Sequence, residues 1–158
     1  LTGRRVAEIA CTASLEPCKD NEFRAIFSGQ LKTKGRNDVV PYEIPLLHNY
    51  AAIAKTLKGV QETNPQFANN PELFNATASS RLSEQVKKHF TGLFEGEPKA
   101  KDLRAIYALL SFNKFQQQGE GEFVTVSINK YFASILGHSE DDVVTCGSYI
   151  DFCTPVKR

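Results

Sequence analysis

The chain lacks the features of a membrane-spanning or secreted protein. No apolar run approaches the roughly 20 residues that a transmembrane helix needs. No positively charged start leads into an apolar stretch with a small-residue cleavage site. Hydrophobic residues nevertheless make up 41% of the 158 residues and charged residues 23%, so the chain can bury a sizeable core. These figures predict a single globular domain over residues 1–158.

Methionine is also absent. The chain opens on Leu1-Thr2-Gly3-Arg4-Arg5, which is typical of the middle of a helix-forming segment. We therefore expect a domain excised from a longer protein.

Cysteine is scarce and is not arranged for a disulfide framework or a zinc site. The four residues form two pairs with a spacing of seven, without C-x-x-C and without histidine at zinc-ligand spacing. In a chain of this length and apolar content, reduced and partly buried thiols are expected. The four residues are Cys11, Cys18, Cys146 and Cys153.

The sequence also lacks an excess of either charge. Nineteen Lys and Arg against eighteen Asp and Glu give a net charge of +1. Nucleic-acid-binding proteins often show bulk basicity, but a balanced charge neither requires nor excludes a polyanionic partner. Any such function must depend on where the cations lie.

Apolar residues at helical spacing predict that most of the chain is helical. Pro45 suits the first turn of one helix and Gly59 its end. Gly137 is suited to follow the helix over residues 128–136. The Asn-, Pro- and Thr-rich residues 60–78 are predicted to be loop, and the polar residues 116–122 a linker. The predicted helices are 6–13, 45–59, one from Ser79 or Ser80, one whose buried stripe is Leu103, Ile106, Tyr107 and Leu110, 128–136, and a short one from Ser139.

Two β-rich runs interrupt the helices. Phe23–Ser28 is rich in β-forming residues, with Phe23, Ala25 and Phe27 at alternate positions. Val39–Ile44 contains Pro41, which restricts it to an edge strand. Residues 29–38 between them are polar and basic. The predicted fold is therefore mainly α with a small β-hairpin (α+β), and the hairpin has a long, positively charged tip.

Four short motifs carry cations or nucleophiles, and the first two lie near the hairpin. Arg5 is near the start of a helix, three residues before Glu8, and the two alone could form an ordinary surface ion pair. Lys32, Lys34 and Arg36 lie within five positions of one another at the hairpin tip. That tip is either a solvated turn or a flexible segment whose ammonium groups bind phosphate.

The other two motifs follow later in the chain. Lys101 and Arg104 fall on one face of a helix, where two cations repel weakly unless an anion lies between them. His138 follows a helix C-terminus, and Tyr149 comes eleven residues later. For a lone His or Tyr, a structural role is the simpler interpretation. The tyrosines that compete with Tyr149 for a chemical role are Tyr42, Tyr50, Tyr107 and Tyr131, of which the last two fall on helical stripes where packing in the core accounts for them.

The order of these motifs resembles the catalytic domain of tyrosine recombinases, in which TGxR, a hairpin Lys, HxxR, LGH and a nucleophilic Tyr follow one another. The resemblance runs from Thr2 to about Phe152. Lysine in the K-x-x-R box and the long spacing from His138 to Tyr149 are similar to the telomere resolvase (protelomerase) branch. A separate DNA-clasping domain upstream is implied. The implied catalytic residues are Arg5, Lys32 (with Lys34 as the alternative), Lys101, Arg104, His138 and Tyr149.

The resemblance implies transesterification at a DNA phosphodiester, without metal or ATP. The Tyr149 oxygen would attack phosphorus and expel the 5′-hydroxyl, which Lys32 would protonate. Arg5 and Arg104 would bind the non-bridging oxygens, as metal ions do in other phosphoryl-transfer enzymes. Lys101 would add a further donor, and His138 would bind an oxygen or manage the tyrosine proton.

The implied partner is double-stranded DNA with a palindromic target site, bound by a dimer. The implied location is cytoplasmic, in a bacterial nucleoid or a phage-infected cell, away from membranes. A telomere resolvase that makes covalently closed hairpin ends is the leading interpretation. A conventional site-specific recombinase and a non-catalytic DNA-binding module of the same fold are the alternatives. The further cations expected to bind DNA are Arg4, Lys34, Arg36, Lys87 and Lys88.

Overall fold

The computed structural model describes residues 1–31, 40–92, 96–115 and 128–137 of the chain. These residues form a mainly helical fold with one small antiparallel sheet, as the sequence predicts. The helices are α1 (Val6–Cys11), α2 (Tyr50–Thr63), the 3-10 helix η1 (Pro65–Phe67), α3 (Pro71–Thr77), α4 (Ser79–Phe90), α5 (Ala100–Phe115) and α6 (Ile128–Leu136). The strands are β1 (Ser14–Pro17), β2 (Arg24–Ser28) and β3 (Tyr42–Pro45).

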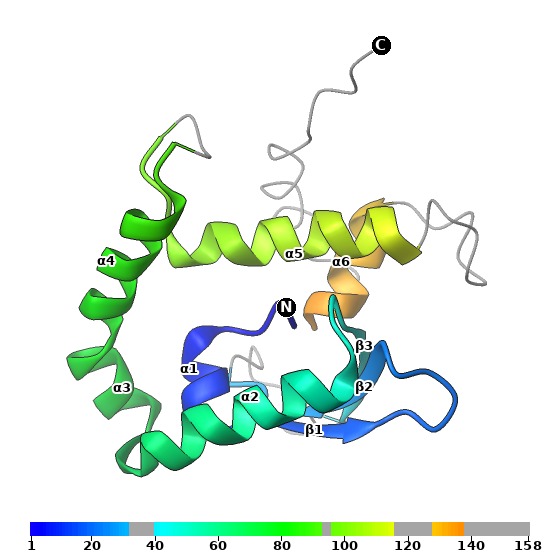
Figure 1. The fold of residues 1–158 in the computed structure, drawn as a ribbon, viewed down its shortest axis with the longest axis horizontal. Coiled ribbons are helices and arrows are strands. Elements are labelled where there is room, and N and C mark those ends of the chain that lie inside the picture. Colours follow the sequence, from blue (N-terminus) through cyan, green and yellow to red (C-terminus); the bar gives the residue numbers. More distant parts are fainter. Residues whose placement is uncertain (32–39, 93–95, 116–127, 138–158) are drawn as a thin grey trace.

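The helices surround α1, which lies near the middle of the fold. Figure 1 shows α5 and α2 along opposite sides, with α3 and α4 joining them at one end and the sheet and α6 at the other. α1 packs against α2 and α3, and α5 packs against α4 and α6. This arrangement places the start of α1 and the start of α5 on the side of α3 and α4.

The sheet has the order β1-β2-β3, with both pairs antiparallel. The central strand β2 alternates as predicted, and Ala25 and Phe27 are fully buried against residues of α2. The predicted hairpin is the β2–β3 pair, in which Phe27 lies opposite Tyr42. β1 was not expected, because a four-residue segment ending in proline is a weak strand signal. Proline is tolerated there because β1 is an edge strand.

The predicted start of the second helix, at Pro45, is wrong by five residues. Pro45 pairs with Arg24 as the last residue of β3, and α2 begins at Tyr50. Asn49 caps this helix, because its side chain accepts a hydrogen bond of 3.0 Å from the Ala52 amide. The helix then continues through Gly59 to Thr63.

The prediction of a loop over residues 60–78 is also wrong, because α2 extends into it and η1 and α3 follow. Asn70 caps α3 by accepting from the Leu73 amide at 3.0 Å, and Pro71 occupies the first turn. Asparagine and proline disfavour helix interiors but are preferred at helix starts. The same residues that indicated a loop therefore begin a helix.

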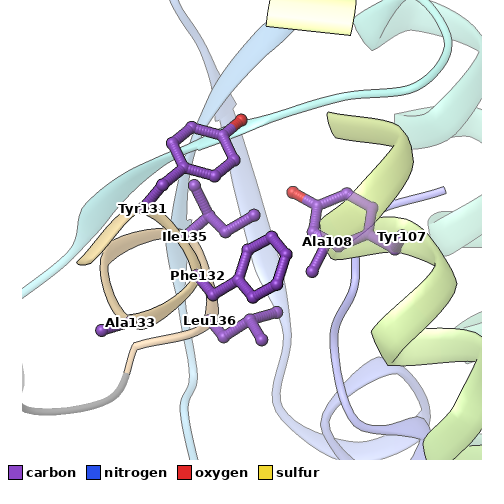
Figure 2. Close-up of a cluster of buried hydrophobic side chains, with 7 residues drawn as sticks. All are labelled: Tyr107, Ala108, Tyr131, Phe132, Ala133, Ile135 and Leu136. Carbon is purple, nitrogen blue, oxygen red and sulfur yellow. The ribbon is translucent and has the colours of Figure 1, made fainter. Parts of the chain in front are cut away.

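α5 and α6 pack against each other through a cluster of buried side chains. Figure 2 shows Phe132 and Leu136 pointing from α6 toward α5, and both are fully buried. Tyr107 and Tyr131 belong to the same cluster, which confirms their predicted place in the core. Leu110 was expected to be buried with Tyr107 but is 49% exposed. The predicted linker 116–122 and the short helix from Ser139 lie outside the described residues.

Two of the four cysteines lie within the described residues, and both are free thiols. Burial raises the pKa of Cys11 and of Cys18, so each stays a neutral thiol at neutral pH. Cys146 and Cys153 lie outside the described residues. In the part of the chain that the structure describes, no helix combines the length and apolar character needed to cross a bilayer.

Candidate functional site

A cavity of about 640 Å³ lies between the starts of α1 and α5 on one side and α3 and α4 on the other. Three of the six predicted catalytic side chains line it, namely Arg5, Lys101 and Arg104. Arg5 precedes α1, whereas the other two lie on the first turns of α5. Residues a hundred positions apart therefore contribute cations to one cavity, and that concentration favours an anionic ligand.

The glycine of the T-G-R-R motif lets the chain approach α5 closely. Gly3 has φ +63°, and a Cβ at this position would overlap the ring of Tyr107. Tyr107 is held in place because its hydroxyl donates to the Pro45 carbonyl at 2.7 Å. Only glycine accepts both the left-handed conformation and the contact. The path of the chain into Arg5 is therefore fixed by packing against α5.

Arg5 is held by a buried carboxylate. The Glu8 side chain is 0% exposed, and its Oε1 accepts from the Arg5 Nη1 at 2.8 Å. Its Oε2 accepts from the Arg5 backbone amide at 2.9 Å. The pair is therefore not an ordinary surface ion pair, because the carboxylate is fully desolvated and depends on these donors.

Glu8 also binds the first stem of the hairpin. Its Oε1 accepts from the Leu31 amide at 3.3 Å, directly before Lys32 in the sequence. One carboxylate thus orients Arg5 and fixes the residue that precedes the predicted general acid. The i,i+3 spacing from Arg5 to Glu8 was visible in the sequence, but nothing local indicated that the carboxylate is buried.

The sequence resemblance implies DNA cleavage at this site, and on that expectation replacing Glu8 with glutamine should slow cleavage of target DNA without weakening DNA binding. The change keeps the shape but removes the charge that orients Arg5, and small misplacements of a reacting group can cost about 10²-fold in rate. Removing the buried negative charge that pairs with Arg5 leaves affinity for DNA equal or higher. Single-turnover cleavage and equilibrium binding of a target duplex measure the two effects.

Glu43→Gln is the matched control, because Glu43 pairs with Arg24 on the sheet and does not line the cavity. It should leave the cleavage rate unchanged. Thermal unfolding of both variants separates a loss of orientation from a loss of folding. Unchanged cleavage in Glu8→Gln, or cleavage and affinity that fall together, would contradict this role for Glu8.

Arg104 and Lys101 lie on the same wall of the cavity but differ in burial. Lys101 is exposed, whereas Arg104 is only 7% exposed and donates from Nη2 to the Leu136 carbonyl at 2.6 Å. Asp102 stabilises the start of α5 by accepting from the Lys99 amide at 2.7 Å. Arg104 therefore joins the K-x-x-R box to the helix that ends directly before Gly137 and His138.

Four of the five tyrosines lie within the described residues, and none of the four lines this cavity. The hydroxyl of Tyr50 donates to the Leu15 carbonyl at 3.0 Å, and that of Tyr42 accepts from Arg4. Burial raises the pKa of Tyr131 to about 12 and raises that of Tyr107 further, so both stay protonated phenols in the core. The structure therefore gives these tyrosines structural roles.

The predicted DNA-binding cations lie in different surroundings. Lys87 and Lys88 are exposed in the last turn of α4, where Lys87 forms an ion pair of 2.7 Å with Glu97, and neither lines the cavity. Arg4 is 7% exposed, and its guanidinium donates to oxygens inside the fold. The predicted site residues that lie outside the described residues are Lys32, Lys34, Arg36, His138 and Tyr149.

The opposite wall of the cavity was not anticipated from the sequence. Asn75, Ser79 and Ser83 line it from α3 and α4, together with the apolar Phe74 and Leu82. Ser79 and Ser83 are spaced by four on α4, which places them on one face of that helix, and Asn75 precedes Ser79 by the same interval on α3. This spacing was a usable signal, but the segment up to residue 78 had been interpreted as loop.

Comparison with known proteins relates this arrangement to one group. The sequence model of one protein family, the telomere resolvase ResT/TelK catalytic domain, matches residues 1–152. Protelomerase TelA covalently complexed with substrate DNA has 26% sequence identity and a TM-score of 0.82, over 98% of this chain and 50% of that one. An arginine-to-alanine mutant of TelA complexed with a DNA hairpin product has 27% identity and a TM-score of 0.84, with the same coverage.

A more distant structure shares the fold. Protelomerase TelK complexed with substrate DNA has 23% identity and a TM-score of 0.70, over 90% of this chain and 28% of that one. No protein with a curated description matches the chain. The chain spans about half the length of the TelA structures that it matches.

Proposed function

Because the chain belongs to the telomere resolvase ResT/TelK catalytic domain family, we propose that it cuts a duplex DNA target and rejoins each strand to its complement. The products are covalently closed hairpin ends. The observation that carries the proposal is that the guanidinium groups of Arg5 and Arg104 line the same cavity, together with Lys101. Guanidinium groups on opposite faces of the molecule could not bind one phosphate.

The reaction exchanges one phosphate ester for another. The Tyr149 oxygen attacks the scissile phosphorus, the bond to the 5′-oxygen breaks, and that oxygen takes a proton from Lys32, with Lys34 as the alternative donor. A 3′-phosphotyrosyl link remains, and attack by the 5′-hydroxyl of the complementary strand releases Tyr149. Because the number of phosphate ester bonds is unchanged, the exchange needs no ATP.

The cations of the cavity stabilise the transition state. Negative charge gathers on the non-bridging oxygens, and two planar guanidinium groups can each bind them through paired N–H donors. Such donors, fixed before the reaction, replace the metal ions of other phosphoryl-transfer enzymes. Lys101 adds a positive charge at the mouth of the cavity, and His138 binds a further oxygen or manages the tyrosine proton.

The assignment of Tyr149 as the nucleophile is supported by the other tyrosines. Each of the four described tyrosines is placed elsewhere, in the core or in a hydrogen bond away from the cavity. Tyr149 is the remaining one of the five, and the matching family region extends to residue 152. The target is a palindromic duplex bound by a dimer, with Lys34, Arg36, Lys87 and Lys88 contacting phosphates.

Incubating the intact protein with a linear duplex that carries one target site tests the proposed function. The expected products are two hairpins. Each is one continuous strand and therefore runs on a denaturing gel as a single strand of twice the length of its arm. The reaction should proceed without ATP and in the presence of EDTA. Binding should weaken steeply with salt, because it depends on phosphate contacts.

Two outcomes would replace this function by another. Products that require a second target site and join two duplexes would identify a conventional recombinase. A suicide substrate that yields no covalent protein–DNA adduct would identify a DNA-binding module without turnover.

A further inference from the structure

Arg4, the neighbour of the first catalytic arginine, is buried without a carboxylate partner among the described residues. Only 7% of it is exposed, and Nε donates to the Thr2 carbonyl at 3.1 Å. Nη1 donates to the Tyr42 hydroxyl, and Nη2 donates to the Ile135 carbonyl. All three acceptors are neutral oxygens. A buried charge is costly unless its donors are satisfied. In the described part of the chain, hydrogen bonds to neutral oxygens, and no carboxylate, satisfy those of Arg4.

Aromatic rings complete the environment of this guanidinium. Its central carbon lies 4.7 Å from the centre of the Phe27 ring and 5.5 Å from that of Tyr42. Phe27 and Tyr42 face each other across β2 and β3 and pack edge to face. Cation–π contacts are stronger when desolvated. Arg4 is therefore bound to the β2–β3 pair at the base of the hairpin.

The same guanidinium binds the C-terminal end of α6. Three successive carbonyls there each accept from a side chain of another segment: Ile135 from Arg4, Leu136 from Arg104, and Gly137 from Gln30 at 2.9 Å. The last carbonyls of a helix have no partner within the helix, and cations are favourable there. Gly137 follows with φ +67° and leads directly to His138.

The turn at Gly137 is closely packed. A Cβ on Gly137 would overlap the Tyr42 hydroxyl, which accepts from Arg4, and the side chain of Gln30 in the hairpin stem. Arg4 thus connects the segment that carries Arg5, the strand that follows the hairpin, and the turn that precedes His138. A DNA contact would require this guanidinium to leave all of these partners.

We propose that Arg4 is a positioning residue, and not a DNA-binding one, that fixes the end of α6 at Gly137, directly before His138 in the sequence, relative to Arg5 and Arg104. Its effect on the cleavage rate rests on the proposed function, whereas its effect on the structure around Gly137 does not. This role replaces the expectation that Arg4 contacts DNA. Lysine cannot substitute, because one ammonium group does not reach both the Tyr42 hydroxyl and the Ile135 carbonyl with fork geometry.

The structural consequence is measured on the intact protein without DNA. The chain has three histidines, His48, His89 and His138, and their imidazole NMR signals can be assigned with His→Ala variants. Arg4→Met should shift the His138 signals and leave those of His48 and His89 in place. Arg24→Met is the matched control, since Arg24 pairs with Glu43 and takes no part at the end of α6.

The kinetic consequence is measured with the target duplex. Arg4→Met should lower the single-turnover rate of covalent complex formation by about 10²-fold, the effect of a small misplacement, while affinity for DNA and its salt dependence stay unchanged. Arg4→Lys should rescue little of the rate. In a His138→Ala background the loss from Arg4→Met should largely disappear, because the two changes remove the same contribution.

Tyr42→Phe keeps the ring and removes only the hydroxyl that accepts from Arg4. This variant serves if Arg4→Met does not fold, and it should show the same pattern with a loss of about tenfold in the single-turnover rate.

A lower affinity for DNA with a reduced salt slope in Arg4→Met would overturn the inference in favour of a DNA contact. Unshifted His138 signals, or losses that simply add in the double variant, would also overturn it. If the wild type forms no covalent complex, the proposed function fails while the NMR comparison still decides this inference.

Discussion

Tyr149→Phe is expected to abolish the covalent protein–DNA complex and the hairpin product. The change removes the oxygen proposed to form the 3′-phosphotyrosyl bond, so the rate should fall below detection, by at least about 10⁴-fold. Affinity for the target duplex should remain, because binding depends on phosphate contacts made by cations. Denaturing gels of the reaction and equilibrium binding of the duplex measure the two effects.

The other tyrosines provide the controls for this experiment. Tyr50→Phe removes a hydroxyl bonded to the Leu15 carbonyl, away from the cavity, and should leave cleavage intact. A covalent complex that persists in Tyr149→Phe would show that another residue is the nucleophile. Loss of DNA binding together with cleavage would show instead that Tyr149 is needed for folding or docking.

Arg104→Lys is expected to lower the single-turnover cleavage rate by about 10² to 10³-fold, the effect of losing one fixed donor to the developing charge. The guanidinium has five N–H donors in one plane, so it can hold the Leu136 carbonyl and still reach into the cavity that it lines. A lysine keeps the charge, but its single ammonium cannot bind the Leu136 carbonyl and a phosphate oxygen in the cavity at the same time. Rapid-quench measurements at saturating protein give this rate.

Lys114→Gln is the matched control on the same helix. Lys114 lies at the far end of α5, where its ammonium is 4.1 Å from the centre of the Phe23 ring, and it does not line the cavity. The rate should be unchanged in this variant. An Arg104→Lys protein that folds and cleaves at the normal rate would remove Arg104 from the proposed mechanism.

Local patterns were sufficient for the elements whose apolar residues recur at regular spacing. α4, α5 and α6 and the alternation of β2 follow from such patterns, because the buried face of a helix or strand repeats at a fixed interval. η1 and α3 were missed because their Asn and Pro residues have opposite meanings inside a helix and at its start. β1 was missed because an edge strand of four residues depends on its partner for its conformation.

Burial of the charged residues at the site could not be read from the sequence. Glu8 was visible as a possible partner of Arg5, yet its complete burial depends on the hairpin stem at Leu31. Arg4 and Arg5 are adjacent and identical in type, but one binds the core and the other lines the cavity. Nothing in their local sequence distinguishes them, because the acceptors that bind Arg4 in the core belong to Tyr42 and Ile135, which are distant in the sequence.

The sequence alone determined which chemistry-bearing side chains the protein has and in what order, because residue type and spacing are properties of the chain itself. The tertiary structure alone decided that Arg5, Lys101 and Arg104 share one cavity and that Arg4 does not act as a surface cation. The reason is that an arginine's role depends on the dielectric and on the acceptors around it, which segments from distant parts of the chain supply only when they pack together.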